Sequence, residues 1–142
     1  MTTLDRHRQV ANRVWLGLRT LMLERYDRRK EVSAALDMSF VRAKALRHLA
    51  AGPMPMRELA AALQTDAPYT TLVVDDLERR GLVARTAHPN DRRSKIVTAT
   101  TDGIRAAQRA DDILNAPPAA VLELTPAELA TLDRIVAKLL SN

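Results

Sequence analysis

Cysteine is absent from this sequence, and aromatic residues are rare, with only four among 142 residues. Without cysteine the chain can form neither a disulfide framework nor a thiolate zinc site, and thiol-based redox sensing is excluded. Four aromatic side chains are too few for the stacking platforms on which single-stranded nucleic acids are usually held. If the protein binds a nucleic acid, a duplex is therefore the favoured form.

Long apolar runs are missing as well. The longest uninterrupted apolar stretches span only a few residues, and the N-terminal sequence MTTLDRHRQ lacks the apolar core of a signal peptide. We therefore expect a cytoplasmic protein that makes no membrane contact. With 46% hydrophobic residues, the chain can still bury the core of one domain.

Residue patterns typical of metal sites, cofactor sites and catalysis are also lacking. The four glycines form no phosphate-binding loop, and the three histidines (His7, His48 and His88) lack the spacing of metal ligands. The acid pairs at 75–76 and 111–112 are helical neighbours that point about 100° apart, so neither forms a catalytic dyad. With no nucleophile, base and orienting group together, we expect no cofactor, no metal and no enzyme.

Positive charge, by contrast, is concentrated in one segment. Residues 79–95 contain six cations and one acid, a local net charge of +5 that equals the formal net charge of the whole chain. The remaining residues therefore sum to zero. A basic segment on an otherwise balanced protein most commonly binds the phosphate backbone of nucleic acid.

Apolar periodicity predicts a mainly helical chain. A helix beginning near residue 100 carries Ile104, Ala107, Asp111 (a polar interruption) and Leu114 on its repeat. The last helix begins with a capping box at Thr125 and Glu128. Helices are expected at about residues 4–30, 38–50, 56–63, 67–80, 100–116 and from 125 onward.

After Gly81 the periodicity changes from about 3.6 residues towards two. Residues 82–87 and 95–99 are typical of two strands, and residues 88–91 supply the turn between them. Two helices joined by a turn and followed by a basic hairpin indicate a winged helix-turn-helix. In such a motif the second helix enters the major groove, and an arginine of the hairpin is drawn into the flanking minor groove by its negative potential.

With these features the chain resembles the MarR-type (multiple-antibiotic-resistance regulator) winged helix-turn-helix repressors. Asp91 and Arg93 form the family's D-x-R signature, and Thr100 to Gly103 form its T-x-x-G. Together with the long flanking helices, the resemblance covers nearly the whole chain. The matching stretches are 52-GPMPMRELAAAL-63, 74-VDDLERRGLVAR-85 and 88-HPNDRRSKIVTATTDG-103.

The resemblance implies a single domain over residues 1–142 that is mainly α with a small β-hairpin wing. It implies a winged helix-turn-helix lobe at about 37–100 and dimerisation helices at about 4–30 and 101–142. The apolar stripes of these terminal helices must be buried, which a homodimer achieves most economically. The expected partners are pseudo-palindromic double-stranded DNA, a second copy of the chain, and a small aromatic or phenolic effector that releases the repressor from its operator.

The resemblance also assigns roles within the wing. Arg93 would enter the minor groove, Asp91 would orient the wing through a salt bridge or hydrogen bonds, and Arg85, Arg92 and Lys95 would contact phosphates. Two other interpretations remain open, a winged-helix module for protein interaction and a regulator without a ligand response. A recognition helix poor in basic residues would be the signal of the first.

The helix at 67–80 is the predicted recognition helix. By helical angle its buried face is centred on Thr70, Val73, Val74 and Leu77. Because such helices dock with their N-terminal end first, that end lies nearest the bases. Many family members carry an arginine in mid-helix where this chain has a leucine, so base contacts should contribute modestly. The candidate DNA-contacting residues of this helix are Ala67, Pro68, Tyr69, Thr71, Leu72 and Arg79.

Overall fold

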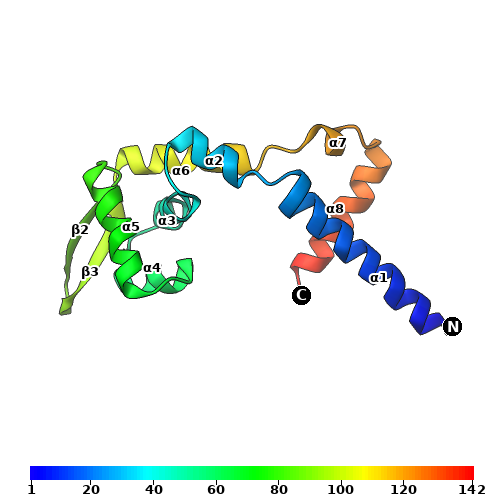
Figure 1. The fold of residues 1–142 in the computed structure, drawn as a ribbon, viewed down its shortest axis with the longest axis horizontal. Coiled ribbons are helices and arrows are strands. Elements are labelled where there is room, and N and C mark those ends of the chain that lie inside the picture. Colours follow the sequence, from blue (N-terminus) through cyan, green and yellow to red (C-terminus); the bar gives the residue numbers. More distant parts are fainter.

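Eight α-helices, one turn of π-helix and three short strands make up the protein. The computed structural model describes residues 1–142. Figure 1 shows a lobe formed by α2 to α6 and the strands, with α1, α7 and α8 lying away from it. The elements are α1 (Thr3–Thr20), η1 (Leu21–Arg25), α2 (Arg29–Leu36), α3 (Phe40–Ala50), β1 (Met54–Pro55), α4 (Met56–Leu63), α5 (Ala67–Arg79), β2 (Val83–His88), β3 (Asp91–Ala99), α6 (Thr101–Leu114), α7 (Ala119–Leu122) and α8 (Pro126–Leu140).

The three strands form an antiparallel sheet in the order β1-β3-β2. The predicted hairpin is confirmed: Val83 pairs with Ala99 and Ala87 with Lys95, and an irregularity follows at His88. Strand β3 begins earlier than expected, at Asp91, because the turn is confined to the two residues between the strands. The two-residue strand β1 was not anticipated, since a segment this short carries no periodicity.

Local capping explains where the two helices of the helix-turn-helix begin and end. Helix α4 ends at Gln64, whose left-handed conformation (φ 56°) turns the chain, and α5 begins after Asp66. The Asp66 carboxylate accepts a hydrogen bond from the Tyr69 backbone N–H at 2.8 Å, which satisfies one unpaired donor of the first turn. The predicted buried face of α5 is confirmed, because Thr70, Val73, Val74 and Leu77 are its buried residues.

Helix α6 packs against α2 and α3 and is therefore part of the lobe, although the sequence grouped it with the terminal helices. Its buried stripe consists of Gly103, Ala106, Ala107 and Ala110. The expectation that Ile104 lies on the buried repeat is wrong, since this side chain is 49% exposed. Small residues let the helix approach its neighbours closely, so the core lies on the side of α6 with the least side-chain bulk.

The prediction of one helix over residues 4–30 is wrong. The π-turn η1 ends at Arg25, and a new helix, α2, starts at Arg29 and packs in the lobe. Between them the Asp27 carboxylate accepts hydrogen bonds from the Arg29 backbone N–H at 3.0 Å and from its Nε at 2.9 Å. The Arg29 guanidinium lowers the pKa of Asp27 to about 2. Such local side-chain bonds compete with continued helix and favour a break.

Helices α1 and α8 bury no residue within the single chain. Trp15 on α1 is 65% exposed, and Leu132, Ile135 and Val136 on α8 are 38 to 42% exposed. Both helices lie on the same side of the molecule, away from the lobe (Figure 1). Their connections to the lobe meet where Arg28 Nη2 donates a hydrogen bond to the Ala116 carbonyl oxygen at 3.1 Å. None of the helices combines the length and apolar character that a bilayer span requires.

We expect Gly103→Ala to lower the free energy of unfolding by about 1 to 3 kcal/mol, because overpacking moves backbone. A Cβ at this position would collide with the carbonyl oxygen of Leu82, which already accepts a hydrogen bond from the Thr100 backbone N–H at 3.0 Å. The T-x-x-G signature thus has two parts: Thr100 caps the helix, and Gly103 lets the helix backbone lie close to the Leu82 carbonyl group. Thermal unfolding at a fixed protein concentration measures the effect.

The control for this prediction is Thr101→Ala, an exposed change in the first turn of the same helix. It should alter the free energy of unfolding by less than about 0.5 kcal/mol. Equal stability of the Gly103 and Thr101 variants would show that the lobe tolerates a wider spacing between α6 and the start of β2.

Candidate nucleic-acid interface

The N-terminal half of α5 presents an uncharged surface to solvent. Ala67, Pro68, Tyr69, Thr71 and Leu72 are all exposed, as expected from the helical angles. The Thr71 hydroxyl donates to the Ala67 carbonyl oxygen at 3.0 Å, which leaves its oxygen free to accept a further hydrogen bond. The surface therefore offers a few polar atoms, a leucine and an aromatic ring, but no cation.

Asp75 and Glu78, two of the three acids of α5, share one cation within the protein. Asp75 forms an ion pair with Arg85 at 2.6 Å, and Arg85 also pairs with Glu78 at 3.0 Å. Hydrogen bonding from Arg85 lowers the pKa of Glu78, and the same contact raises the pKa of Arg85. The helix consequently carries less uncompensated negative charge than its sequence indicates.

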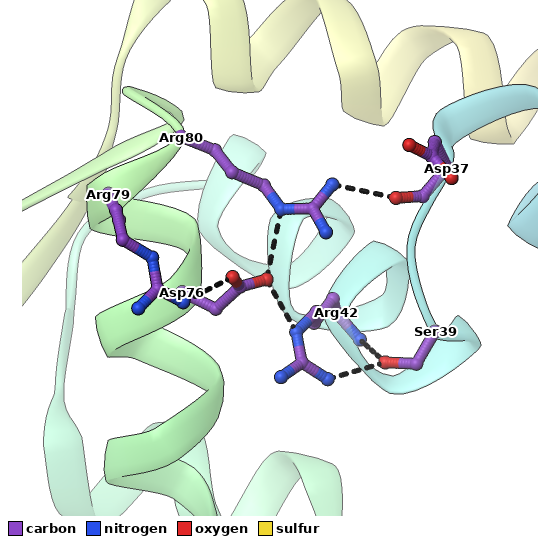
Figure 2. A network of polar contacts seen from close by, with 6 residues as sticks. All are labelled: Asp37, Ser39, Arg42, Asp76, Arg79 and Arg80. Atoms are coloured by element: carbon purple, nitrogen blue, oxygen red, sulfur yellow. Dashed lines mark hydrogen bonds and ion pairs between the residues drawn. The ribbon is translucent and has the colours of Figure 1, made fainter.

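Asp76 is the centre of a second group of contacts, drawn in Figure 2. Its carboxylate binds the guanidinium groups of Arg79, Arg80 and Arg42 at 2.6, 3.0 and 2.8 Å. The hydrogen bond from Arg79 is the main cause that lowers the pKa of Asp76, although burial opposes it. Arg79 remains exposed while making this contact, so it stays available at the surface.

The wing cations differ from the rest of the basic segment. Arg79, Arg80 and Arg85 have carboxylate partners, whereas no ion pair involves Arg92, Arg93 or Lys95, all three of which are exposed. Within the basic segment at 79–95, the cations without a carboxylate partner therefore all lie on β3. The predicted phosphate contact of Arg85 stays a prediction, and that side chain would have to share its charge with two acids.

At the start of β3, Asp91 accepts a hydrogen bond from the backbone N–H of Arg93 at 3.0 Å. Asp91 and Arg93 are held together by this bond rather than by an ion pair. The bond fixes the backbone from which the Arg93 side chain projects. The predicted orienting role of Asp91 is compatible with this geometry and stays a prediction.

A cleft runs between the wing, α4 and α5. Its walls include Arg93 and Lys95 from the wing, Thr71 from α5, and Arg57 from α4. Arg57 is exposed and makes no ion pair. It was not predicted from the sequence, because it stands alone, well before the basic segment. The sequence feature that could have identified Arg57 is its outward position in the first turn of α4, the helix that precedes α5.

These residues place cations on both sides of an uncharged helix end. A duplex that receives the N-terminal half of α5 in its major groove would bring phosphates towards Arg57 and Lys95 and a minor groove towards Arg93. No three histidine, cysteine, aspartate or glutamate side chains gather where they could share a metal ion.

The segment from α3 to the wing, residues 44–95, matches the family model described as "MarR family". No curated protein sequence is significantly similar to the chain. Members of the matched family are transcription regulators and not enzymes, in agreement with the expectation from the sequence.

Three solved structures show the same fold. YusO from Bacillus subtilis is 25% identical, with a TM-score of 0.75 over 94% of this chain and 96% of its own. A point mutant of MarR from E. coli is 25% identical, with a TM-score of 0.67 over 99% and 98% of the two chains. MepR from S. aureus in a DNA complex is 23% identical, with a TM-score of 0.61 over 87% and 98%. Residues 44–95 therefore match the MarR family, and over nearly its whole length the chain has the fold of transcription regulators of that family.

Proposed function

We propose that the protein is a homodimeric repressor that binds pseudo-palindromic double-stranded DNA through α5 and the wing. The observation that carries the proposal is a set of exposed cations without a carboxylate partner: Arg57, Arg93 and Lys95 line the cleft beside the uncharged end of α5, and Arg92 lies on the same strand as Arg93. Unpaired cations in such an arrangement are suited to phosphates. MepR, which shares the fold, has been solved in complex with DNA.

Because the exposed end of α5 is uncharged, this helix would contribute contacts with bases rather than with phosphates. Leu72 and Tyr69 can make apolar contacts with thymine methyl groups, and Thr71 can accept one hydrogen bond, so each discriminates by about 1 to 3 kcal/mol at best. The wing and α4 then supply most of the affinity through the backbone and the minor groove. Binding should accordingly depend steeply on salt and moderately on sequence.

The uncovered apolar faces of α1 and α8 support the homodimer. Exposed leucine and valine side chains occur on both helices, with Trp15 on α1 and Ile135 on α8, and burial against a second copy would remove them from water. A two-fold axis through this region would set the two recognition helices about one DNA turn, roughly 34 Å, apart. Because α2 and α6 pack in the lobe, the dimer would be formed by residues 3–25 and 119–140 rather than by the longer segments expected from the sequence.

Fluorescence anisotropy with a labelled duplex tests the proposal. The probes are the DNA upstream of the protein's own reading frame and duplexes selected by the wild-type protein from a random pool. We expect the logarithm of the affinity to fall linearly with the logarithm of the salt concentration, with a slope of about −0.9 per phosphate contacted. Absence of binding to every duplex would reject the DNA-binding function and favour a protein-interaction module.

The family resemblance supports control by a small aromatic effector. Such a molecule would act by binding preferentially to a dimer whose lobes are spaced incorrectly for successive major grooves. Repeating the anisotropy titration with salicylate and related phenols should weaken binding. Identical affinities with and without these compounds would instead favour a regulator without a ligand response.

A further inference from the structure

Asp76 occupies an unusual position on the recognition helix. Its side chain is only 14% exposed, yet it belongs to the helix that presents Leu72 and Thr71 to solvent. Its Oδ2 accepts hydrogen bonds from Arg42 Nε at 2.8 Å and Arg80 Nε at 3.0 Å, and its Oδ1 accepts one from Arg79 Nη2 at 2.6 Å. The carboxylate therefore points along the flank of α5, towards α3, and is fully engaged within the protein (Figure 2).

The arginines carry this contact on to two other elements. Arg42, which belongs to α3, also donates from Nη1 to the hydroxyl of Ser39, the N-cap of that helix, at 2.9 Å. Arg80 Nη1 donates to the Asp37 carbonyl oxygen at 2.7 Å. Asp37 ends α2 in a left-handed conformation with φ 52°. One carboxylate thus joins the recognition helix to the corner between α2 and α3.

These polar contacts add to the apolar packing of α5 against the core. The buried side chains of α5 are Val73, Val74, Leu77 and the hydroxyl-bearing Thr70. Hydrogen bonds to a planar guanidinium have fixed directions, so they define the angle between two helices more closely than apolar contacts do. Arg42 is 17% exposed and its Nε faces Asp76, so its charge is used inside the lobe.

We infer that Asp76 and Arg42 are positioning residues that set the direction in which α5 projects and thereby control discrimination between DNA sequences. Both side chains are mostly covered within the lobe, so they would act through the residues at the exposed end of α5. The inference rests on the proposed function, because discrimination has meaning only for a protein that binds duplex DNA. A positioning role explains why residue 76 is acidic, whereas a carboxylate in direct contact with phosphates would repel them.

Two substitutions with opposite charge effects test the inference. Asp76→Asn makes the protein more positive by one unit, and Arg42→Gln makes it more negative by one unit. Each variant is titrated against a duplex selected by the wild type and against a random-sequence duplex of equal length. We expect the ratio of the two affinities to fall about tenfold in both variants, the equivalent of one lost base contact. Affinity for the random duplex should rise with Asp76→Asn and fall with Arg42→Gln.

Asp75→Asn is the matched control, since it changes the same charge on the neighbouring residue of the same helix. Arg85, its partner, retains Glu78 after the substitution. Both affinities should rise together, and the ratio should stay within about twofold of the wild-type value. A tenfold loss in this variant as well would overturn the inference, because any charge change on α5 would then have the same effect.

Other results would also overturn it. Ratios that move in opposite directions in the two test variants would assign the effect to charge alone, and a wild-type ratio with reduced thermal stability would assign these residues a structural role only. Should either test variant fail to fold, Arg42→Lys keeps the charge but replaces the two nitrogens that bond Asp76 and Ser39, Nε and Nη1, with a single flexible ammonium. Its ratio should be lowered, and a wild-type ratio would refute the inference. If the wild-type protein selects no duplex, the proposed function itself fails, which the first titration reveals before any variant is made.

Discussion

Leu132→Asp should convert the protein from a dimer into a monomer and lower its affinity for operator DNA by about 100-fold or more, the usual loss when two linked sites bind separately. Leu132 is 38% exposed in the single chain and lies on the face of α8 that also carries Leu129, Val136 and Leu139. Burying a carboxylate in such a contact costs several kcal/mol unless it finds a partner. Light scattering measures the mass, and anisotropy with the operator duplex measures the affinity.

Ala130→Asp is the control for this prediction. It adds the same carboxylate to α8, but a 100° advance per residue places position 130 on the opposite side of the helix from Leu132 and Val136. This variant should remain dimeric and bind the operator normally. A monodisperse wild-type monomer at micromolar concentration would reject the homodimer, and a dimeric Leu132→Asp would exclude this face of α8 from the interface.

Arg93→Ala should lower duplex affinity by about 10- to 100-fold, because an arginine in a narrow minor groove meets concentrated negative potential. The Arg93 side chain makes no ion pair and is exposed, so thermal stability should not change. The salt dependence should become shallower by about one phosphate contact. Anisotropy at several salt concentrations and a thermal melt together measure both quantities.

Arg105→Ala is a suitable control, since it removes the same charge from an exposed position on α6, where Arg105 pairs only with Asp102 at 3.6 Å. Its effect on affinity should be small. A duplex carrying 2,6-diaminopurine in place of adenine adds an amino group to the minor groove. This duplex should bind the wild type less tightly than the unmodified one and should make little difference to Arg93→Ala. Equal sensitivity of both proteins to diaminopurine would remove Arg93 from the minor groove.

Periodicity predicted the elements that bury long apolar faces. The buried side of α5 and the hairpin of β2 and β3 are confirmed. In each, the spacing of the bulky apolar residues allows only one side of the element to be buried. The same reasoning failed for α6, where it put Ile104 inside. The buried side there is lined by alanine and glycine, and small residues contribute too little hydrophobicity to dominate a periodic pattern although they pack most closely.

Contacts between residues far apart in the sequence account for other differences between the expected and the observed structure. Asp75 and Asp76 were expected to add negative charge to the recognition helix, but cations from other elements neutralise both. Arg42 and Asp76 are separated by 34 residues, and only the packing of α3 against α5 brings them together. The break after Arg25 has a local cause, the side chain of Asp27, yet the apolar stripe continues across it and masks the signal.

The Arg28–Ala116 hydrogen bond has a mechanical consequence. Both crossings of the chain between the lobe and the terminal helices, residues 26–28 and 115–118, meet at this bond and form a single stalk. The wing lies at the end of the lobe farthest from the terminal helices (Figure 1). If the lobe rotates about this stalk, α2 lies close to the axis of rotation and the tip of the wing lies far from it. A slight rotation at the stalk therefore displaces Arg93 far more than it displaces any residue near Arg28.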